Sequence, residues 1–321
     1  MKIKVISPGV LATVQDTGRF GHQAAGIPEA GAMDRASLLL ANALIGNPED
    51  AAALELTVFG GTFEFDGEGT IALTGADMRP FLNGNRMSIN TAVPVKAGDR
   101  LELGAASRGM RTYLAVSGGI DVPVVLGSRS TDLKSRLGGL DGRKLRAGDV
   151  LESGAVDGSL QLGRSLRQAQ GTSSLQEPSQ GLSSGPVLQR LSRVTDPEGV
   201  TRIRFLFGPQ DAMFAEDAKK TFTDSTYTLS AACDRMGYRL EGVAVPSLNG
   251  TDILSEGICF GSIQVPANGQ PIVMMADHQT TGGYAKIGTV LSEDLPLLAQ
   301  LGPGKRIHFV PVTLEELGES L

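Results

Sequence analysis

Short apolar runs separated by glycine-containing turns recur along most of this chain. The first run, residues 3–6, ends at the turn Ser7-Pro8-Gly9, and a longer series of runs begins at Leu54. Turns between the later runs have the sequences DGEG, NGN, AGDR and AGDV. Short runs between such turns are typical of β-barrels and β-sandwiches. The pattern predicts a protein that is mainly β with a few helices.

Three segments depart from the strand pattern and carry helix signals. Residues 34–45 are rich in Ala and Leu, with Asp34 as a natural N-cap and Gly46 at the stop. The second predicted helix, residues 209–219, starts with proline, which suits the first turn of a helix. The third, residues 292–301, ends at a Gly-Pro-Gly sequence. These few helices leave the mainly β prediction unchanged.

The strand pattern is interrupted once, by a segment rich in Ser, Gln and Gly. Residues 156–190 contain few apolar side chains that could anchor them to a core, so a flexible linker is predicted there. The linker divides the chain into a first β-barrel domain, residues 1–155, and a second one, residues 191–321. Residues 105–155 are interpreted as a segment appended to the first domain.

The two halves share a faint sequence repeat. Asp34-Arg35 matches Asp234-Arg235 at an offset of 200 residues, and Glu55 matches Glu256 at an offset of 201. Collinear matches of this kind favour two related β domains. The recurrence also favours a structural ion pair between Glu256 and Asp234-Arg235 over a ligand site.

The composition of the 321 residues narrows the class of protein. A chain of this length suggests two domains. The formal net charge of −6 argues against nucleic acid and against an anionic membrane as partners. The N-terminus lacks the apolar core of a signal peptide, and no apolar run reaches the length of a membrane span. These features predict a cytoplasmic protein without a membrane partner.

Cysteine and histidine offer little candidate chemistry. Cys233 and Cys259 cannot define a disulfide framework, and the sequence has no CxxC. His22, His278 and His308 are scattered and lack neighbouring ligands at metal spacing, so no metal site is predicted. The sequence also lacks the GxxxxGK[ST] motif of a Walker-type ATP site.

Polar side chains gather at residues 277–286, within the sequence ADHQTTGGYAK. Acid, amide, hydroxyl and amine groups stand beside Gly282-Gly283, where the backbone can approach a ligand closely. The first half has Asp77-Met78-Arg79-Pro80 at the equivalent place, and a difference at one point of a repeated scaffold favours a binding site over a structural loop. A second segment, GSRST at residues 127–131, suits a carboxylate or phosphate and equally suits a polar loop end.

Four longer stretches resemble a known family: VQDTGRFGHQAAGIPEAGAMD, YLAVSGGIDVPVVLGSRST, SEGICFGSIQVP and ADHQTTGGYAKI. They are similar to the family of 5-oxoprolinase C subunits, also called allophanate hydrolase subunit 2-like. That family is in turn similar to the carboxyltransferase domain of biotin-dependent urea carboxylase. The resemblance covers nearly the whole chain apart from roughly residues 156–190. It implies two related cyclophilin-like β-barrel domains.

The resemblance implies that the chain works as one part of an enzyme complex. With partners of the A type and the B type, the complex would open a lactam, 5-oxoproline, to glutamate at the expense of ATP. One alternative is a biotin-dependent carboxyltransferase that acts on urea or a similar small amide. Another is a non-enzymatic antagonist of a protein that inhibits a kinase.

Under the resemblance, the polar residues receive roles from the chemistry of their side chains. Gln279 and Thr280 would hydrogen-bond a small amide, and backbone N–H groups at Gly282-Gly283 would reach a developing oxyanion. Asp277 or Tyr284 would transfer protons.

Positive charge completes this predicted site. Lys286 or Arg129 would hold a carboxylate or the oxygens of carboxybiotin by charge-assisted hydrogen bonds. The predicted catalytic residues are Asp277, Tyr284 and Lys286. The predicted substrate-binding residues are Gln279, Thr280, Gly282, Gly283, Arg129 and Ser128.

Overall fold

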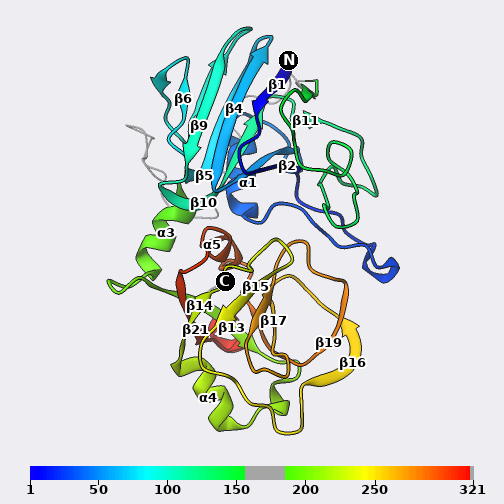
Figure 1. The fold of residues 1–321 in the computed structure, drawn as a ribbon, viewed down its shortest axis with the longest axis vertical. Helices are drawn as coiled ribbons and strands as arrows, with labels where there is room; N and C mark the ends of the chain where they lie inside the picture. The colour runs from blue at the N-terminus through cyan, green and yellow to red at the C-terminus, as the bar shows by residue number, and fades with distance from the viewer. Residues whose placement is uncertain (156–184, 319–321) are drawn as a thin grey trace. The chain divides into compact units, whose positions relative to one another are not determined.

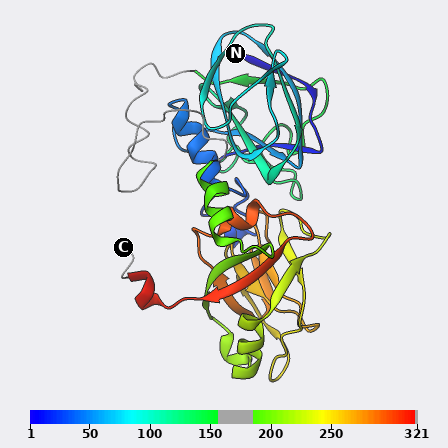
Figure 2. The same cartoon turned by 90° about the vertical axis from the view of Figure 1, so that its left-hand side faces the viewer.

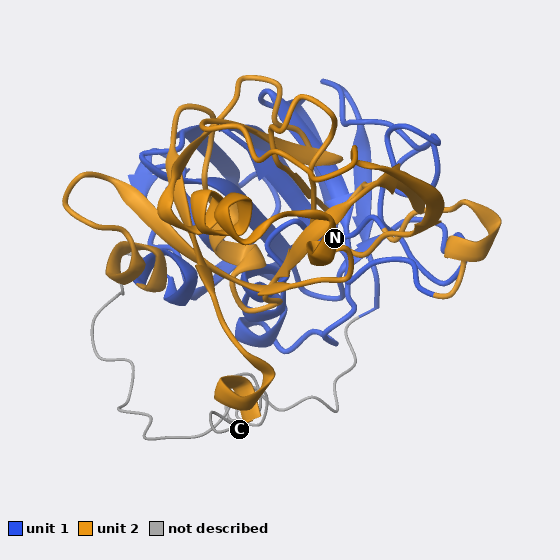
Figure 3. Cartoon of the chain, turned by 90° about the horizontal axis from the view of Figure 1, so that it is seen from below, with its two compact units in different colours: residues 1–20, 30–189 blue, residues 21–29, 190–321 orange. Residues whose placement is uncertain are grey.

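The computed structural model describes residues 1–155 and 185–318. The chain forms two compact units, one of residues 1–20 and 30–189 and the other of residues 21–29 and 190–321 (Figure 3). Most of the predicted linker, residues 156–184, lies outside the described residues. Its last residues differ from the prediction, because helix α3 (Pro186–Val194) begins within the segment predicted as linker.

Unit 1 is built from two sheets (Figure 1). One has the strand order β11-β12-β1-β4-β9-β6-β7 and the other the order β2-β3-β10-β5-β8. The strands are β1 (Lys2–Ser7), β2 (Leu11–Gln15), β3 (Ala53–Thr57), β4 (Phe59–Asp66), β5 (Gly69–Asp77), β6 (Phe81–Leu82), β7 (Asn85–Arg86), β8 (Ala92–Val95), β9 (Arg100–Ala105), β10 (Arg108–Val116), β11 (Ile120–Asp121) and β12 (Val150–Ser153).

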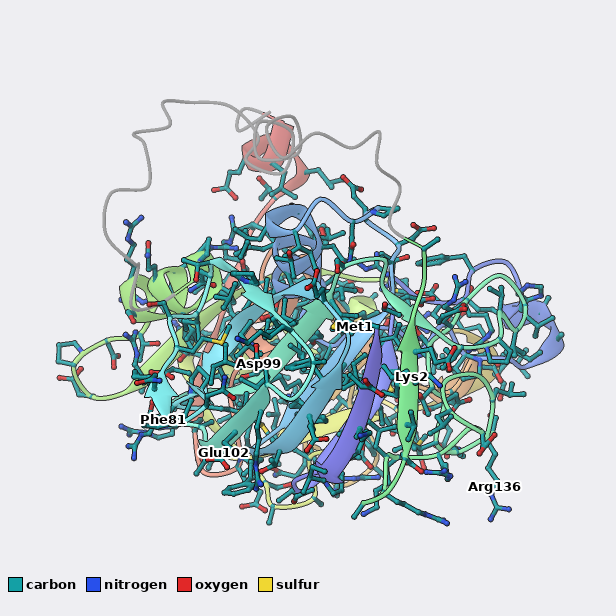
Figure 4. All side chains as sticks on the ribbon, turned by 90° about the horizontal axis from the view of Figure 1, so that it is seen from above. Met1, Lys2, Phe81, Asp99, Glu102 and Arg136 are labelled. Carbon is teal, nitrogen blue, oxygen red and sulfur yellow. The ribbon has the colours of Figure 1, made fainter. Side chains whose placement is uncertain are left out.

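The core of unit 1 follows from the alternation of apolar residues along these strands. β1 pairs with β4 so that Ile3 lies opposite Phe65 and Val5 opposite Phe63, and all four side chains are buried. Burial of each such side chain stabilises the fold by about 1.5–3 kcal/mol. The alternate residues of β1 carry charge: Lys4, between Ile3 and Val5, pairs with Glu64 at 3.2 Å, and Lys2 (Figure 4) pairs with Glu152 of the neighbouring strand.

Helix α1 (Arg35–Leu44) confirms the first predicted helix and lies against β5 and β10 (Figure 2). The Asp34 carboxylate accepts hydrogen bonds from the backbone N–H of Ser37 at 2.9 Å and from its hydroxyl at 2.6 Å. Small residues of the sheet, Ala53 and Ala72 among them, pack with Leu38 of the helix. The absence of larger side chains at these sheet positions lets the helix approach closely.

Unit 2 contains a closed barrel with the strand order β13-β20-β17-β18-β15-β14-β21 and a separate ribbon of β16 and β19 (Figure 1). The barrel strands are β13 (Val200–Phe207), β14 (Thr226–Leu229), β15 (Gly237–Glu241), β17 (Ser262–Gln264), β18 (Ile272–Met274), β20 (Lys286–Val290) and β21 (Arg306–Pro311). The ribbon strands are β16 (Asp252–Gly257) and β19 (Thr281–Tyr284). The helical segments are η1 (Gln23–Ala25), η2 (Asp211–Met213), α4 (Glu216–Asp224), α5 (Leu295–Ala299) and α6 (Leu314–Gly318). The prediction of a mainly β fold with a few helices is confirmed, and unit 2 contains a closed barrel. In unit 1, for which a barrel was also predicted, the strands form two sheets.

An aromatic cluster fills one part of the barrel. Phe222 of α4 stacks on Phe309 with ring centroids 4.6 Å apart, and its ring meets that of Phe205 edge-on at 5.2 Å. Aromatic pairs in these arrangements contribute about 0.5–1.5 kcal/mol each beyond the area they bury. Packing of Phe222 therefore fixes α4 against the barrel.

Two predicted helices differ from the structure. In place of one helix over residues 209–219, the short turn η2 is followed by α4, which starts only at Glu216. Phe214 interrupts the helix because its backbone is extended and its side chain is buried. The helix predicted over residues 292–301 is confined to Leu295–Ala299.

The positions that the sequence repeat equates differ in their strand pairing. β1 pairs with β12 and β4, whereas β13, at the equivalent place in the second half, pairs with β20 and β21. Asp34 caps a helix, but Asp234 accepts hydrogen bonds from the backbone of a turn that leads into β15. The repeat therefore does not predict which strands are neighbours.

No helix among the described residues is both long and apolar enough to cross a membrane.

The capping role of Asp34 predicts a measurable loss of stability. Asp34→Ala removes the acceptor for the first turn of α1, so the free energy of unfolding should fall by about 1–2 kcal/mol in urea denaturation. Asp34→Asn keeps a capping acceptor and should lose less. Equal stability of the alanine variant and the unmodified chain would contradict this role.

Candidate functional site

The polar segment 277–286 connects three strands of unit 2. Asp277 lies just beyond the end of β18, the next residues lead into β19, and Lys286 is the first residue of β20. The ribbon partner of β19 is β16, which places Glu256 opposite Gly282. The structure therefore places the ribbon residues of the segment and Lys286 beside β16.

Asp277 forms a buried ion pair with Arg235. The Nε and Nη2 atoms of Arg235 each donate to one carboxylate oxygen of Asp277 at 2.8 Å, and both side chains are buried. The predicted ion pair between Glu256 and Asp234-Arg235 is thus wrong, because Arg235 has Asp277 as its partner. A bidentate pair of this kind is well suited to holding the start of the segment in place. The catalytic role of Asp277 stays a prediction.

Lys286 is buried and forms an ion pair with Glu256, which is half-exposed. Gln210 joins this pair, since its side-chain Nε2 donates to the Oε1 atom of Glu256 at 2.6 Å. The Oε1 atom of Gln210 accepts from the backbone N–H of Lys286 at 3.1 Å, and the backbone N–H of Gln210 donates to the carbonyl of Lys286 at 3.1 Å. Gln210 therefore ties the carboxylate to the backbone of β20.

The electrostatics of this network favour an ionised carboxylate at neutral pH. Hydrogen bonds from Lys286 and then from Gln210 lower the pKa of Glu256 below its usual range. A lowered pKa means that the ion pair stabilises the folded state above the ordinary pKa of a glutamate. That contribution is lost as the pH falls through the lowered pKa.

No sequence pattern marks Gln210 as functional, and the repeat assigns Glu256 to the scaffold.

The middle of the segment is held mainly through its backbone. The carbonyl of Gln279 lies 2.7 Å from Nδ1 of His278, and the carbonyl of Thr280 accepts from the backbone N–H of Ile258 at 3.0 Å. Tyr284 is exposed at the end of β19. The roles predicted for the side chains of Gln279, Thr280 and Tyr284 remain predictions.

Gly282 and Gly283 lie within β19, and neither has a positive φ angle. Close packing explains the first of them. A Cβ atom at Gly282 would lie 2.4 Å from Cδ1 of Ile258 and 2.6 Å from Nε2 of Gln264. A Cβ at Gly283 would come no closer than 3.3 Å to any atom, the nearest being the carbonyl oxygen of Ile253. The predicted contact of their N–H groups with an oxyanion stays a prediction.

His278 is a further candidate for a binding or catalytic residue, although its sequence neighbours lack the spacing of metal ligands. Its side chain is buried, and its Nε2 atom has no hydrogen-bond partner among residues 1–155 and 185–318. Buried polar atoms in folded proteins are usually hydrogen-bonded, so this exception within a polar cluster makes Nε2 of His278 a candidate for contact with a ligand. No group of three or more His, Cys, Asp and Glu residues in the described part of the chain could hold a metal ion.

The two remaining predicted residues, Ser128 and Arg129, belong to unit 1. The hydroxyl of Ser128 donates to Asp16 at 2.7 Å, and the backbone N–H of Arg129 donates to the same carboxylate at 2.5 Å. Asp16 is buried and is further hydrogen-bonded to Ser130. These contacts hold the base of the loop, and the substrate-binding role of Ser128 stays a prediction.

Arg129 lines a small cavity within unit 1. Its Nε atom donates to the carbonyl of Val122 at 3.0 Å, and its Nη2 atom lies 3.6 Å from the carboxylate of Asp121. The cavity measures about 170 Å³, and Gly118 and Gly119 form another part of its wall. Arg129 therefore lines a cavity whose wall also includes Asp121.

The fold and these polar networks define a mainly β protein of two units, in which a buried lysine of the barrel pairs with a glutamate of a glycine-containing ribbon. Residues 25–311 match the family described as carboxyltransferase domain, subdomain A and B, and the chain belongs to this family. The resemblance to the 5-oxoprolinase C subunits is also confirmed. The chain is 42% identical to the C subunit of 5-oxoprolinase from Escherichia coli (strain K12), and the match covers 98% of this chain and 92% of the relative.

Two further comparisons extend the similarity to larger proteins. Urea amidolyase of Lachancea kluyveri is 33% identical, with a match that covers 97% of this chain and 17% of that protein. The crystal structure of the K. lactis urea amidolyase superimposes with a TM-score of 0.81 at 29% identity and covers 99% of this chain and 19% of that one. The same architecture therefore occurs as a separate chain and as a part of a longer protein.

The packing around the ribbon predicts that its two glycines respond differently to substitution. Gly282→Ala inserts a methyl group against the ends of the Ile258 and Gln264 side chains, which must shift, so we expect a loss of about 1 kcal/mol in the free energy of unfolding. Gly283→Ala, the matched control, should cost less because its nearest neighbour is further away. Urea denaturation of both variants measures the difference, and equal effects would show that close packing does not explain Gly282.

Proposed function

We propose that this chain is the C subunit of an ATP-dependent 5-oxoprolinase complex, which opens 5-oxoproline to glutamate. The observation that carries the proposal is the 42% identity to the E. coli protein over nearly the full length of both chains. A second 5-oxoprolinase C subunit, from Haemophilus influenzae, is 36% identical over 95% of this chain and 89% of the relative. Similarity across both units makes a shared role more plausible than similarity of one domain alone would.

The proposal includes partners, because the relatives are named as one subunit of an enzyme. Proteins of the A type and the B type would complete the complex. The sequence has no Walker-type motif, so ATP is proposed at the level of the complex. A cytoplasmic location is part of the same proposal, since the reaction consumes ATP.

In the proposed reaction water adds to the lactam carbonyl, the ring C–N bond breaks, and the nitrogen becomes the amino group of glutamate. The site must therefore hold a planar amide and stabilise charge on its oxygen. Lys286 provides a cation next to the ribbon, and the predicted contacts of Gln279, Thr280 and the backbone of Gly282-Gly283 would orient the amide. Asp277 or Tyr284 would transfer the proton, and His278 is a third candidate for this role.

Carboxyl transfer to urea or a similar small amide is the second candidate function. The family description and the similarity to urea amidolyase favour it. Biotin would supply the carboxyl group to be transferred, and a cationic Lys286 beside amide donors is a donor set that fits carboxylate oxygens. The non-enzymatic alternative is not supported, because the relatives are named as parts of enzymes.

A reconstitution assay tests the first proposal. Glutamate release from 5-oxoproline and ATP is measured with the A-type and B-type proteins, with and without this chain. We expect release only in the complete mixture. Unchanged release without the chain, or none with it, would refute the proposal. Incorporation of labelled bicarbonate into urea in the presence of a biotin carboxylase would instead favour carboxyl transfer.

The proposed role of Lys286 gives a second prediction for the same assay. Lys286→Met removes the charge and keeps most of the buried stem, so kcat/KM should fall by about 10²-fold or more while the chain stays folded. Lys219→Met is a matched control, because Lys219 is also ion-paired in unit 2, with Asp211 at 2.9 Å. Full activity of the Lys286 variant would exclude Lys286 from the site.

A further inference from the structure

Gln264 occupies an irregular position in the barrel wall beside the ribbon. It is the last residue of β17, and its side chain is 1% exposed. Ile263 lies opposite Gly288 on β20, but Gln264 lies opposite Lys286, so the register skips Ile287. Such β-bulges re-aim side chains and are common next to active sites. The bulge therefore gives the side chain of Gln264 a direction that regular pairing would not.

The amide nitrogen of Gln264 has no acceptor within the described structure. Its Nε2 atom is buried and has no hydrogen-bond partner among the residues outside 156–184 and 319–321. A buried donor in this state lowers the stability of a protein, and an apolar side chain of the same shape would avoid the penalty. A purely structural role thus does not account for a glutamine at this position.

The surroundings of this nitrogen coincide with the candidate site. Nε2 of Gln264 packs against Gly282, where a Cβ atom would come within 2.6 Å of it. Gly282 lies opposite Glu256 in the ribbon, and Glu256 is the residue to which Lys286 extends its amine. The amide of Gln264 and the amine of Lys286 therefore approach the same pair of ribbon residues from adjacent barrel strands.

Both groups donate hydrogen bonds, and one of them is charged. Two converging donors suit an oxygen acceptor such as a carbonyl or a carboxylate. The amine of Lys286 has Glu256 as a partner, whereas the amide of Gln264 has none among the residues that the structure describes. Because Gly282 has no side chain, the buried amide lies directly against the ribbon backbone.

The geometry points to Gln264 as a substrate-binding residue whose amide donates to the carbonyl oxygen of a small amide or lactam. The inference rests on the proposed function, because it takes its ligand class from the reaction proposed above. It adds a residue that the sequence did not single out. The glycine at residue 282 of β19 fits this position of the amide, since a Cβ atom there would lie 2.6 Å from the donor nitrogen.

Gln264→Met tests the inference in the reconstituted complex, because methionine keeps the length of the side chain and removes the donor. We expect the KM for 5-oxoproline to rise about tenfold or more, with a smaller change in kcat. We also expect the melting temperature of the chain to stay unchanged or to rise by a few degrees, since a buried unpaired donor is removed. A normal KM would overturn the assignment, whatever the melting temperature.

A control and a direct binding experiment separate this inference from the proposed function. Gln270→Met is the control, because Gln270 already pairs with the backbone of Gly242 at 3.0 and 3.1 Å, and its KM should stay normal. The side-chain amide signal of Gln264 in the ¹⁵N-labelled chain, assigned by its loss in Gln264→Met, is followed during titration with 5-oxoproline and with urea. A shift with urea in a complex that releases no glutamate would retain Gln264 as a binding residue and reject the oxoprolinase proposal. A signal that neither compound moves would overturn the inference.

Discussion

The ion pair between Lys286 and Glu256 is the interaction on which the geometry of the candidate site depends. The ribbon of β16 and β19 forms a sheet of its own, and this pair connects it to the barrel strand β20. Burying an amine is costly unless a partner neutralises it. Glu256 provides the opposite charge, and Gln210 holds the carboxylate through a hydrogen bond of 2.6 Å. The charge proposed for chemistry is thus also the charge that pairs the ribbon with the barrel.

A second ion pair fixes the other end of the same segment. Arg235 and Asp277 meet through two hydrogen bonds of 2.8 Å in a buried setting, and breaking such a pair by removing one partner typically costs about 3–5 kcal/mol. The segment 277–286 is therefore held at its first and last residues by charges from separate strands or turns. Groups between two such anchors are positioned before a ligand arrives, which reduces the entropy lost on binding.

The sequence predicted those features whose signals are local. α1 was predictable because Asp34, its cap, and the Ala- and Leu-rich body lie within a few residues of each other. The start of α4 was not, because it depends on burial of Phe214, which the sequence around it does not reveal. Long-range partners were mispredicted for the same reason. Arg235 reaches Asp277, 42 residues away, and Gln210 reaches Glu256, 46 residues away, and no spacing rule links such positions.

Part of the cost that unit 2 carries falls at its polar site. The buried nitrogens of Gln264 and His278 lack partners among the described residues, although folded proteins satisfy most such atoms. A protein tolerates lower stability of this kind where function requires it. Lactam opening and carboxyl transfer both begin with a planar amide whose oxygen must be held by donors. One donor set built around Lys286 and Gln264 can therefore serve both reactions, and what the partner chains deliver, ATP or a carboxylated biotin, would then decide between them.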